Sequence, residues 1–482
     1  MLISKSKYLI GLQCPKYFWT AFHDPDKIPK PDAATERKFE QGNLVGDLAK
    51  ESFPGGIDIP SDDFMGNINQ TKELLNEKKP LFEAGIMVDS LFSRADVLNP
   101  VGDEWDIIEV KSSTKVKDIN LHDVSFQKHV YEKAGLKIRK CFLMHINNEY
   151  VKKGDIDPKA LFTIEDITEQ VNELFDGVQE RVDNMKQILS SKTIPDSIIG
   201  KQCKDPYDCP IDSCWNFLPE NHIFELYRGG RKSFELLEKD ILAIADIPDD
   251  FKLTGKQEIQ KNCEKTGKPY IDKSNIKQFL KGLQCPLYYL DFETFSPVVP
   301  MFEGTRPYRR IPFQYSLHIV DSDGSIKHHS FLASGTDDPR PEFIASLKSV
   351  LGDKGSVVVW NESFEKGVLN ELAADFPSYE DWKNGIIARV VDLLVPFRNF
   401  HYYDPVQKGS ASIKKVLPAL TGKSYSDLDI NNGEDASISF LTTTYGEVSE
   451  EEKEKVRSDL EKYCCLDTEG MIWILDELKK LV

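Results

Sequence analysis

The chain has 482 residues, of which 40% are hydrophobic and 29% are charged, the composition of a globular protein. The formal net charge is −18; residues 1–215 hold 28 Lys and Arg against 36 Asp and Glu, which gives −8 there and leaves −10 for the rest. This excludes a general nucleic-acid binder held by overall positive charge, but it leaves room for a nuclease with a local basic groove. No apolar run reaches about 18 residues, so we expect no membrane span, and the N-terminus lacks a signal-peptide core, which predicts a cytoplasmic location.

The segment 1–215 alternates between predicted strands and helices. Its apolar pattern predicts strands over 81–88, 93–98, 105–113 and 140–147. The same reasoning predicts helices over 41–53, 70–78, 122–135 and 164–189. The last of these is interpreted as one long amphipathic helix.

Two carboxylates and a lysine are placed together by this pattern. Asp96 ends one strand, and Glu109 and Lys111 lie two residues apart on the next, so their side chains share one face. A hairpin between the strands can bring Asp96 beside Glu109. Two carboxylates hold a hard divalent cation such as Mg²⁺ or Mn²⁺, and a lysine can polarise an attacking water. These are the parts that phosphodiester hydrolysis requires.

Together with Gln127 and Tyr131, which lie one helical turn apart, this stretch resembles the RecB-type branch of the PD-(D/E)XK nucleases, in particular the CRISPR-associated RecB-like exonucleases. The resemblance implies a restriction-endonuclease-like α/β core. It also implies a metal held by Asp96 and Glu109, a catalytic Lys111, and substrate contacts from Gln127 and Tyr131.

One position departs from this family pattern. The early helix of the family usually offers a histidine to the metal, whereas this chain has Gly46 there. A degenerate site that is kept as a strand-binding platform is therefore the alternative.

Four cysteines form a second group in the same segment. Cys203, Cys209 and Cys214 lie within twelve residues, and Cys14 precedes them by 189 residues. In a reducing compartment, clustered cysteines bind metal more often than they pair, and four thiolates suit either zinc or an iron–sulfur cluster. RecB-like relatives with one N-terminal cysteine and three after the nuclease core carry a 4Fe–4S cluster, and this pattern resembles theirs. The resemblance implies a 4Fe–4S staple, with zinc as the alternative.

The second half of the chain begins after a charged, mostly helical segment, residues 216–286, which we interpret as a connector. Beyond it the pattern predicts strands over 287–295, 313–320, 356–361 and 388–394. Helices are predicted over 364–376 and 458–481. Strands followed by alternating helices suit an α/β layer fold.

A set of acidic residues is spread over this second half. Asp291 and Glu293 share one face of an apolar strand, which is costly unless a cation neutralises them. Tyr463 and Asp467 stand four residues apart on one helix face, and Glu365 lies where a strand turns into a helix.

These motifs resemble the DnaQ-like 3′–5′ exonucleases of the RNase H-like superfamily, in the subtype with a tyrosine in the last motif. The resemblance implies an RNase H-like α/β fold. It also implies two divalent metals (Mg²⁺ or Mn²⁺) held by Asp291, Glu293, Glu365 and Asp467, with Tyr463 orienting the attacking water. The second motif usually reads Asn-x-x-Phe-Asp, and here a glutamate, Glu365, takes the place of the aspartate.

A mixed basic and aromatic segment follows the first acidic strand. Residues 307–318 combine Arg309 and Arg310 with Tyr308, Phe313 and Tyr315, as expected of a surface that contacts a single strand. A solvated loop beside a core strand would give the same pattern.

The whole chain resembles a bacterial family of uncharacterised function that fuses an iron–sulfur RecB-like nuclease domain (1–215), through a helical connector (216–286), to a DnaQ-like exonuclease domain (287–482). We expect a metal-dependent nuclease that acts on single-stranded ends of DNA or RNA, with the C-terminal domain working 3′ to 5′. The alternative is a non-catalytic nucleic-acid-binding or complex-assembly protein with two relict sites. The sequence does not choose between DNA and RNA and indicates no protein partner.

Overall fold

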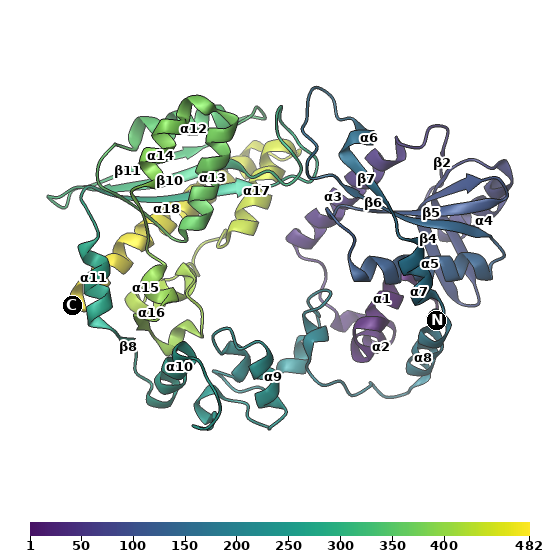
Figure 1. Cartoon of the computed structure of the whole chain (residues 1–482), viewed down its shortest axis with the longest axis horizontal. Coiled ribbons are helices and arrows are strands. Elements are labelled where there is room, and N and C mark those ends of the chain that lie inside the picture. The colour runs from purple at the N-terminus through teal and green to yellow at the C-terminus, as the bar shows by residue number, and fades with distance from the viewer. The chain divides into compact units, whose positions relative to one another are not determined.

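The computed structural model describes residues 1–482 and has a mixed α/β fold, as the sequence predicts (Figure 1). The chain divides into two compact units: the first is Met1–Asn216 with Pro297–Arg309, and the second is Phe217–Ser296 with Arg310–Val482. The segment interpreted as a connector therefore belongs almost entirely to the second unit. None of the helices combines the length and the apolar character that a membrane crossing needs.

The first unit is built on a seven-stranded sheet. Its strands are β1 (Ile3–Ser4), β2 (Ile57–Asp58), β3 (Leu81–Val88), β4 (Leu91–Val101), β5 (Glu104–Lys111), β6 (Ile138–Ile146) and β7 (Phe162–Asp166). The order is β2-β3-β4-β5-β6-β7, and β1 pairs with β4. β4 runs antiparallel to β3 and β5, whereas β5 and β6 run parallel.

Helices cover both faces of this sheet. They are α1 (Lys5–Gln13), α2 (Pro15–His23), α3 (Ala33–Lys50), α4 (Phe64–Leu74), α5 (Asp118–Lys133), α6 (Pro158–Leu161), α7 (Thr168–Phe175) and α8 (Val178–Ser190). The single helix predicted over 164–189 is wrong. Its first residues form β7, because pairing with β6 satisfies their backbone groups, and Gly177 separates α7 from α8.

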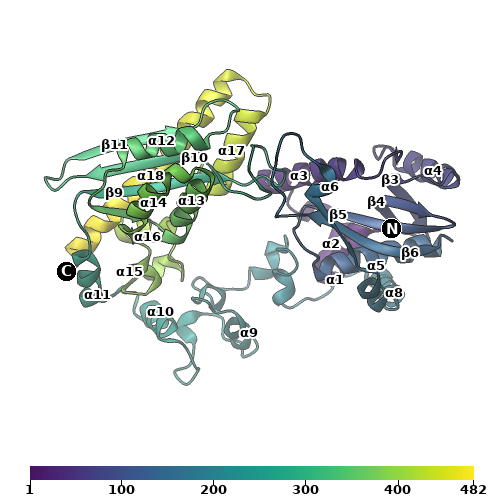
Figure 2. The ribbon, with the colours of Figure 1, turned by 45° about the horizontal axis from the view of Figure 1, so that its top comes forward.

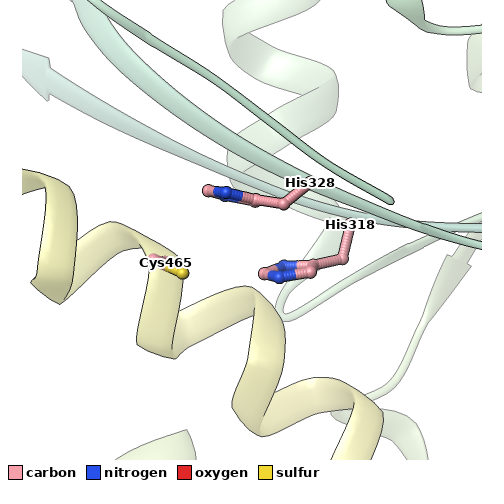
Figure 3. Close-up of side chains that lie close together, drawn as sticks. All are labelled: His318, His328 and Cys465. Carbon is pink, nitrogen blue, oxygen red and sulfur yellow. The ribbon is translucent and has the colours of Figure 1, made fainter. Parts of the chain in front are cut away.

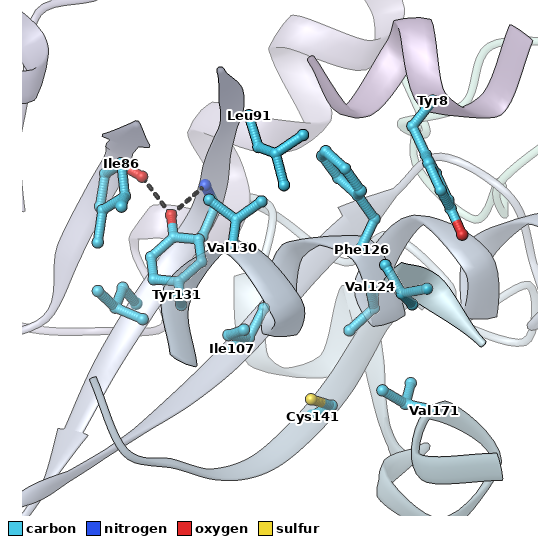
Figure 4. Close-up of a cluster of buried hydrophobic side chains, with 14 of the residues drawn as sticks. Tyr8, Ile86, Leu91, Ile107, Val124, Phe126, Val130, Tyr131, Cys141 and Val171 are labelled. Carbon is cyan, nitrogen blue, oxygen red and sulfur yellow. Dashed lines mark hydrogen bonds between the residues drawn. The ribbon is translucent and has the colours of Figure 1, made fainter. Parts of the chain in front are cut away.

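The main core of the first unit lies between the sheet and α1, α5, α7 and α8. Phe126 and Val130 of α5 pack there with Tyr8 of α1 and with strand residues such as Ile107 (Figure 4). A second apolar layer on the other face includes Val45 of α3. The continuous apolar strands of the sequence are therefore explained by burial on both faces.

The second unit contains a five-stranded sheet. Its strands are β9 (Leu287–Phe295), β10 (Ile311–Val320), β11 (Ile326–Leu332), β12 (Ser356–Val359) and β13 (Val390–Asp392), in the order β11-β10-β9-β12-β13. β10 is antiparallel to β9 and β11, and β12 is parallel to β9 and β13. A separate pair joins β8 (Tyr270–Ile271) to β14 (Tyr402–Tyr403).

The second unit contains ten α-helices. They are α9 (Arg231–Leu237), α10 (Gly255–Thr266), α11 (Lys273–Lys281), α12 (Arg340–Val350), α13 (Glu362–Asp375), α14 (Glu380–Ile387), α15 (Val395–Arg398), α16 (Ile413–Thr421), α17 (Gly433–Tyr445) and α18 (Glu450–Lys480). Leu290 and Phe292 of β9 pack with α12 and α13. The alternate residues of β9 face α18, which packs along β9 and β10 (Figure 2).

Candidate active sites

An acidic cleft lies at the end of β9 in the second unit. Asp291 and Glu293 of β9, Glu365 of α13, and Tyr463 and Asp467 of α18 all line one cavity of about 260 Å³. The two carboxylates of β9 and the thiol of the neighbouring Cys464 have ligand atoms within 4.8 Å of one another. The acidic residues predicted from distant parts of the sequence are thus brought together.

Burial raises the pKa of all four carboxyl groups in this cleft, and repulsion between carboxylates adds to the rise for three of them. Burial, together with the charges of Asp467, Glu293 and Glu365, holds the pKa of Asp291 well above its usual range. Burial raises the pKa of Glu293 and of Glu365 to about 8, and that of Asp467 to about 6. Four carboxyl groups with too little positive charge around them are a set that a divalent cation would stabilise.

Glu365 carries a further sign of an incomplete site. Its side chain is 1% exposed, and its Oε2 has no hydrogen-bond partner. A buried carboxylate oxygen without a partner costs free energy, and a bound cation would supply that partner. The glutamate that replaces the usual aspartate therefore lines the cleft, and its free oxygen is left for a ligand.

Two residues that were not predicted as site residues lie against the acidic side chains of the cleft. The Tyr425 hydroxyl donates a hydrogen bond to Asp467 Oδ1 at 2.6 Å. Lys414 of α16 is the only basic residue that lines the cavity, and its Nζ lies over the rings of Tyr425 and Tyr463 at 5.8 and 5.3 Å. No spacing rule links these residues to the acidic motifs: Lys414 lies on a separate helix, and Tyr425 lies in the loop after that helix, which has no apolar periodicity.

Asp392 of β13 has a structural role next to this cleft. Its Oδ1 accepts hydrogen bonds from the backbone N–H groups of Asn361 and Leu394, and its Oδ2 pairs with Arg398 at 3.2 Å. These bonds hold the turn between β12 and α13, where Asn361 adopts a left-handed conformation with φ of 82°. This turn positions Glu365 at the start of α13.

The carboxylate and lysine set of the first unit also comes together. Asp96 of β4 and Glu109 and Lys111 of β5 line a cavity of about 730 Å³. The Asp96 carboxylate accepts a hydrogen bond from the backbone N–H of Val110 at 2.7 Å, where the pairing of β4 with β5 has ended. Lys111 Nζ lies 2.5 Å from Glu109 Oε1.

Lys5 is a second lysine of this site, and the sequence reasoning missed it. Its Nζ donates to both oxygens of Glu109, at 2.8 and 3.1 Å, and lies 3.7 Å from Asp96 Oδ1. β1 pairs with β4, which sets the start of α1 beside Asp96. Burial opposes the effect, but Lys111 and Lys5 hold the pKa of Glu109 well below its usual range. Burial and the charge of Glu109 raise the pKa of Asp96 to about 6.

The two helical residues predicted to contact substrate have different surroundings. Gln127 is buried, and its amide donates to Glu109 Oε2 at 2.6 Å and to Asp123 Oδ1 at 3.1 Å. Tyr131 is fully buried in the core, where its hydroxyl joins the backbone of β3 and β4 (Figure 4). Gln127 therefore orients Glu109, whereas Tyr131 joins two strands and lines no part of the cavity.

Gly46 of α3 lines the same cavity, at the position where the family pattern has a histidine. A Cβ atom built at Gly46 would meet nothing within 4 Å. Packing in the folded structure therefore does not require a glycine at position 46, and a larger side chain would fit there.

The four predicted ligand cysteines line one pocket in the first unit. Cys14 lies between α1 and α2, and the N–H of Cys209 donates to the carbonyl of Cys203 at 2.9 Å. The neighbouring Gln13 amide donates to two carbonyl oxygens of the 202–207 segment, at 2.8 and 2.7 Å. These bonds fasten the first helix to the cysteine-rich segment.

Comparison with known proteins gives a family match to part of the chain. Residues 288–412 match the family described as Domain of unknown function (DUF2779). "Uncharacterized protein MG366 homolog" of Mycoplasma pneumoniae is 30% identical over 220 residues, which cover 42% of this chain and 33% of the relative. "Uncharacterized protein UU173" of Ureaplasma parvum is 26% identical over 266 residues, covering 51% and 38%. The chain spans about a third of the length of the curated relatives it matches.

The two arginines predicted to contact a strand do not line the acidic cleft. Arg309 is half-buried and is the last residue of the first unit's second segment. Arg310 pairs with Glu371 at 2.7 Å, and its guanidinium lies 5.6 Å from the ring centre of Phe364. Phe364 does line the cleft, so Arg310 supports an aromatic wall of the site.

Proposed function

We propose that the protein is a metal-dependent nuclease whose second unit, an RNase H-like domain of the DnaQ type, hydrolyses phosphodiester bonds from the 3′ end of a single strand. The observation that supports this proposal is the gathering of four buried carboxyl groups with raised pKa in one cleft. Asp291, Glu293, Glu365 and Asp467 would hold two Mg²⁺ or Mn²⁺ ions. Bound there, such ions would generate a hydroxide nucleophile and stabilise the leaving oxygen.

The other residues of the cleft have roles that follow from their contacts. Burial and the surrounding negative charge hold the pKa of Tyr463 far above its usual range, so its hydroxyl stays protonated and can orient a water molecule. Lys414 supplies the positive charge that a phosphate group would meet. Trp360 and Phe364 offer aromatic faces for stacking against terminal bases.

The activity is tested with purified full-length protein, Mn²⁺, and single- and double-stranded DNA and RNA oligonucleotides labelled at either end. We expect stepwise shortening from the 3′ end. Asp291→Asn should lower the rate by more than about a hundredfold, since loss of even an outer-sphere partner of a metal costs 10–100-fold. Asp353→Asn, a change of an exposed aspartate in the same unit, is the matched control.

Absence of digestion on every substrate would contradict the proposal and would favour a non-catalytic nucleic-acid-binding or assembly protein. Digestion that survives Asp291→Asn but is lost in Lys111→Ala would move the catalytic site to the first unit.

For the first unit, which resembles a RecB-like PD-(D/E)XK domain, we propose a strand-binding site that keeps the form of a nuclease site. Two observations favour binding. Lys5 and Lys111 already neutralise Glu109, and Gly46 offers no metal ligand. Lysines at such a site would meet backbone phosphates directly. Under this proposal Lys111→Ala weakens the binding of single-stranded oligonucleotides and leaves the rate of shortening at saturating substrate unchanged.

We also propose that Cys14, Cys203, Cys209 and Cys214 hold a 4Fe–4S cluster in the reducing cytoplasm, with zinc as the alternative. The four cysteines line one pocket, which supports a shared ligand. The test is the visible absorption and the iron and sulfide content of anaerobically purified protein. Cys209→Ser should remove both signals, whereas the exposed Cys285→Ser should leave them unchanged. Bound zinc without iron would overturn the cluster.

A further inference from the structure

A second group of side chains of the kinds that bind metals lies in the second unit, outside the acidic cleft. His318 of β10 and His328 of β11 are directly opposite each other on the antiparallel pair, and Cys465 of α18 faces them (Figure 3). One nitrogen of each imidazole and the Cys465 sulfur lie within 4.8 Å of one another. A hairpin and a helix that is distant from it in sequence thus converge on one point.

One assignment of protons allows all the hydrogen bonds around the two imidazoles to form at once. The Thr468 hydroxyl donates to the carbonyl of Cys465 at 3.0 Å, and a hydroxyl has one proton to donate. For all bonds to form at once, Ser316 Oγ and His318 Nδ1 must therefore donate to Thr468 Oγ1, at 2.7 and 2.8 Å. The single hydroxyl proton of Ser316 is then engaged with Thr468, so His328 Nε2 must donate to Ser316 Oγ, at 2.9 Å.

This network leaves one unprotonated nitrogen on each ring. The remaining atoms are His318 Nε2 and His328 Nδ1, each with a lone pair. A metal-binding histidine normally donates its other N–H group to a fixed acceptor, which sets the tautomer and the ring orientation. Thr468 and Ser316 are those acceptors here.

The charge state of the group is suited to a cation. Burial and the neighbouring His328 lower the pKa of His318 to about 4, and partial desolvation of the His328 ring, together with the neighbouring His329, lowers the pKa of His328. Both rings are therefore neutral near pH 7. Neutral rings can stack closely, and the ring centroids here lie 4.3 Å apart. A thiol binds a metal as the thiolate, so a metal that binds there must displace the Cys465 proton.

We propose that His318, His328 and Cys465 bind a divalent transition metal of the zinc class. Two imidazoles and one thiolate are borderline and soft ligands, unlike the carboxylate oxygens of the acidic cleft, so the two sites select different ions. On binding, the Cys465 thiol loses its proton to solvent and the thiolate bonds to the metal. His328 is exposed, which leaves a fourth position open to water.

Such an ion would join the outer hairpin of the sheet to the helix that carries Tyr463 and Asp467. Cys465 lies between these two residues on α18. A metal bound to the hairpin and the helix would thus resist local opening of the helix turn that forms one wall of the acidic cleft. Its role is structural, and it does not depend on the nuclease proposal.

The test is a titration of the anaerobically purified full-length protein with Co²⁺, followed by displacement with Zn²⁺. Cobalt bound to a thiolate gives a sulfur-to-metal charge-transfer band. We expect the wild type to bind one more equivalent of Co²⁺ with this band than Cys465→Ser binds. Any band from Co²⁺ at the four cysteines is common to both proteins and cancels in the difference, and Co²⁺ held by the carboxylates of the acidic cleft gives no such band. Cys285→Ser is the matched cysteine control.

Histidine variants test the same site without changing its sulfur. His328→Ala should weaken Co²⁺ binding at least about tenfold, and His329→Ala, next to it on β11, should not. Thr468→Val keeps the shape of a buried side chain and removes the acceptor of His318, so it should weaken binding by about 10–100-fold. The melting midpoint should rise with Zn²⁺ in the wild type and less in these variants.

Equal cobalt stoichiometry and affinity in the wild type, Cys465→Ser and His328→Ala would overturn the proposal. His328 is exposed, so its substitution leaves the fold intact and a negative result cannot be assigned to unfolding. Digestion of oligonucleotides need not be measured at any point in this experiment.

Discussion

The two units each gather carboxylates at the end of a strand, yet they neutralise them in opposite ways. In the first unit, Glu109 has two lysines within 3 Å of its carboxylate, and its pKa is lowered. In the second unit, the cavity around Asp291 has four carboxyl groups and only Lys414 as a basic residue, and every carboxyl pKa is raised.

This difference teaches what each site lacks. The first site is already balanced by side chains of the chain itself, so a cation entering it must compete with Lys5 and Lys111. The second site is short of positive charge, and a divalent cation would relieve both the repulsion and the unpartnered Oε2 of Glu365. Motifs that look alike in sequence therefore form a charge-balanced site in one unit and a site short of positive charge in the other.

The largest effect is expected from removing the lysine that balances the first site. Lys5→Met leaves Glu109 buried with one ion-pair partner fewer, which should cost about 3 kcal/mol of stability, the lower end for breaking a buried pair, because Lys111 remains. Hydrogen exchange read by mass spectrometry would locate the loss in the first unit. Lys72→Met, at an exposed lysine of α4, is the control. Unchanged protection around β5 would show that Lys5 is dispensable.

A smaller effect of the opposite kind is expected from adding metal to the second site. At a free Mn²⁺ concentration a hundred times the Kd, binding should stabilise the fold by about 2.7 kcal/mol. The carboxyl groups have a higher pKa when folded than when unfolded, so the folded state binds more protons between about pH 4 and pH 8. Without metal, stability therefore falls as pH rises through this window, and the stabilisation by Mn²⁺ is largest near pH 8.

The measurement is the melting midpoint with and without Mn²⁺ across this pH range. Glu293→Gln should flatten the pH dependence of the metal-free protein and weaken the response to Mn²⁺, whereas the exposed Glu342→Gln should change neither. A metal response that is independent of pH would contradict the account of the raised pKa values.

Residues that repeat with strand or helix spacing could be predicted from the sequence, and residues brought in by tertiary structure could not. Asp291 and Glu293 were predictable because alternate strand residues share a face. Lys5 was not, because it reaches Glu109 only through the pairing of β1 with β4. Tyr425 lies in a loop without periodicity.

The same limit explains the errors in secondary structure. The charged and apolar residues of 164–189 suit one amphipathic helix, but pairing with β6 draws the first of them into a strand. Strand β11 was not predicted, since its exposed residues lack the apolar alternation of a half-buried strand.

A gain of metal affinity in the first site is the next prediction. Gly46→His adds an imidazole where a Cβ meets no atom within 4 Å, in the cavity that Asp96 and Glu109 line. We expect Mn²⁺ to bind that site about tenfold more tightly, which is about 1.4 kcal/mol. Calorimetry in an Asp291→Asn background isolates the site, and Gly385→His, an equally open position in the second unit, is the control. Unchanged affinity would mean that the two lysines exclude the ion whatever ligand is added.

The smallest effect concerns a hydroxyl that tunes one carboxylate of the second site. Tyr425 donates to Asp467 Oδ1 and thereby opposes the rise of its pKa, which burial sets at about 6. Tyr425→Phe removes that donor, so the pKa should rise further and Mn²⁺ binding should weaken on the acid side. We expect the acid limb of the Mn²⁺ affinity to move up by about half a pH unit, less than 1 kcal/mol. The limb should stay in place in Tyr445→Phe; if it also stays in Tyr425→Phe, Asp467 owes its ionisation to Lys414 and Tyr463.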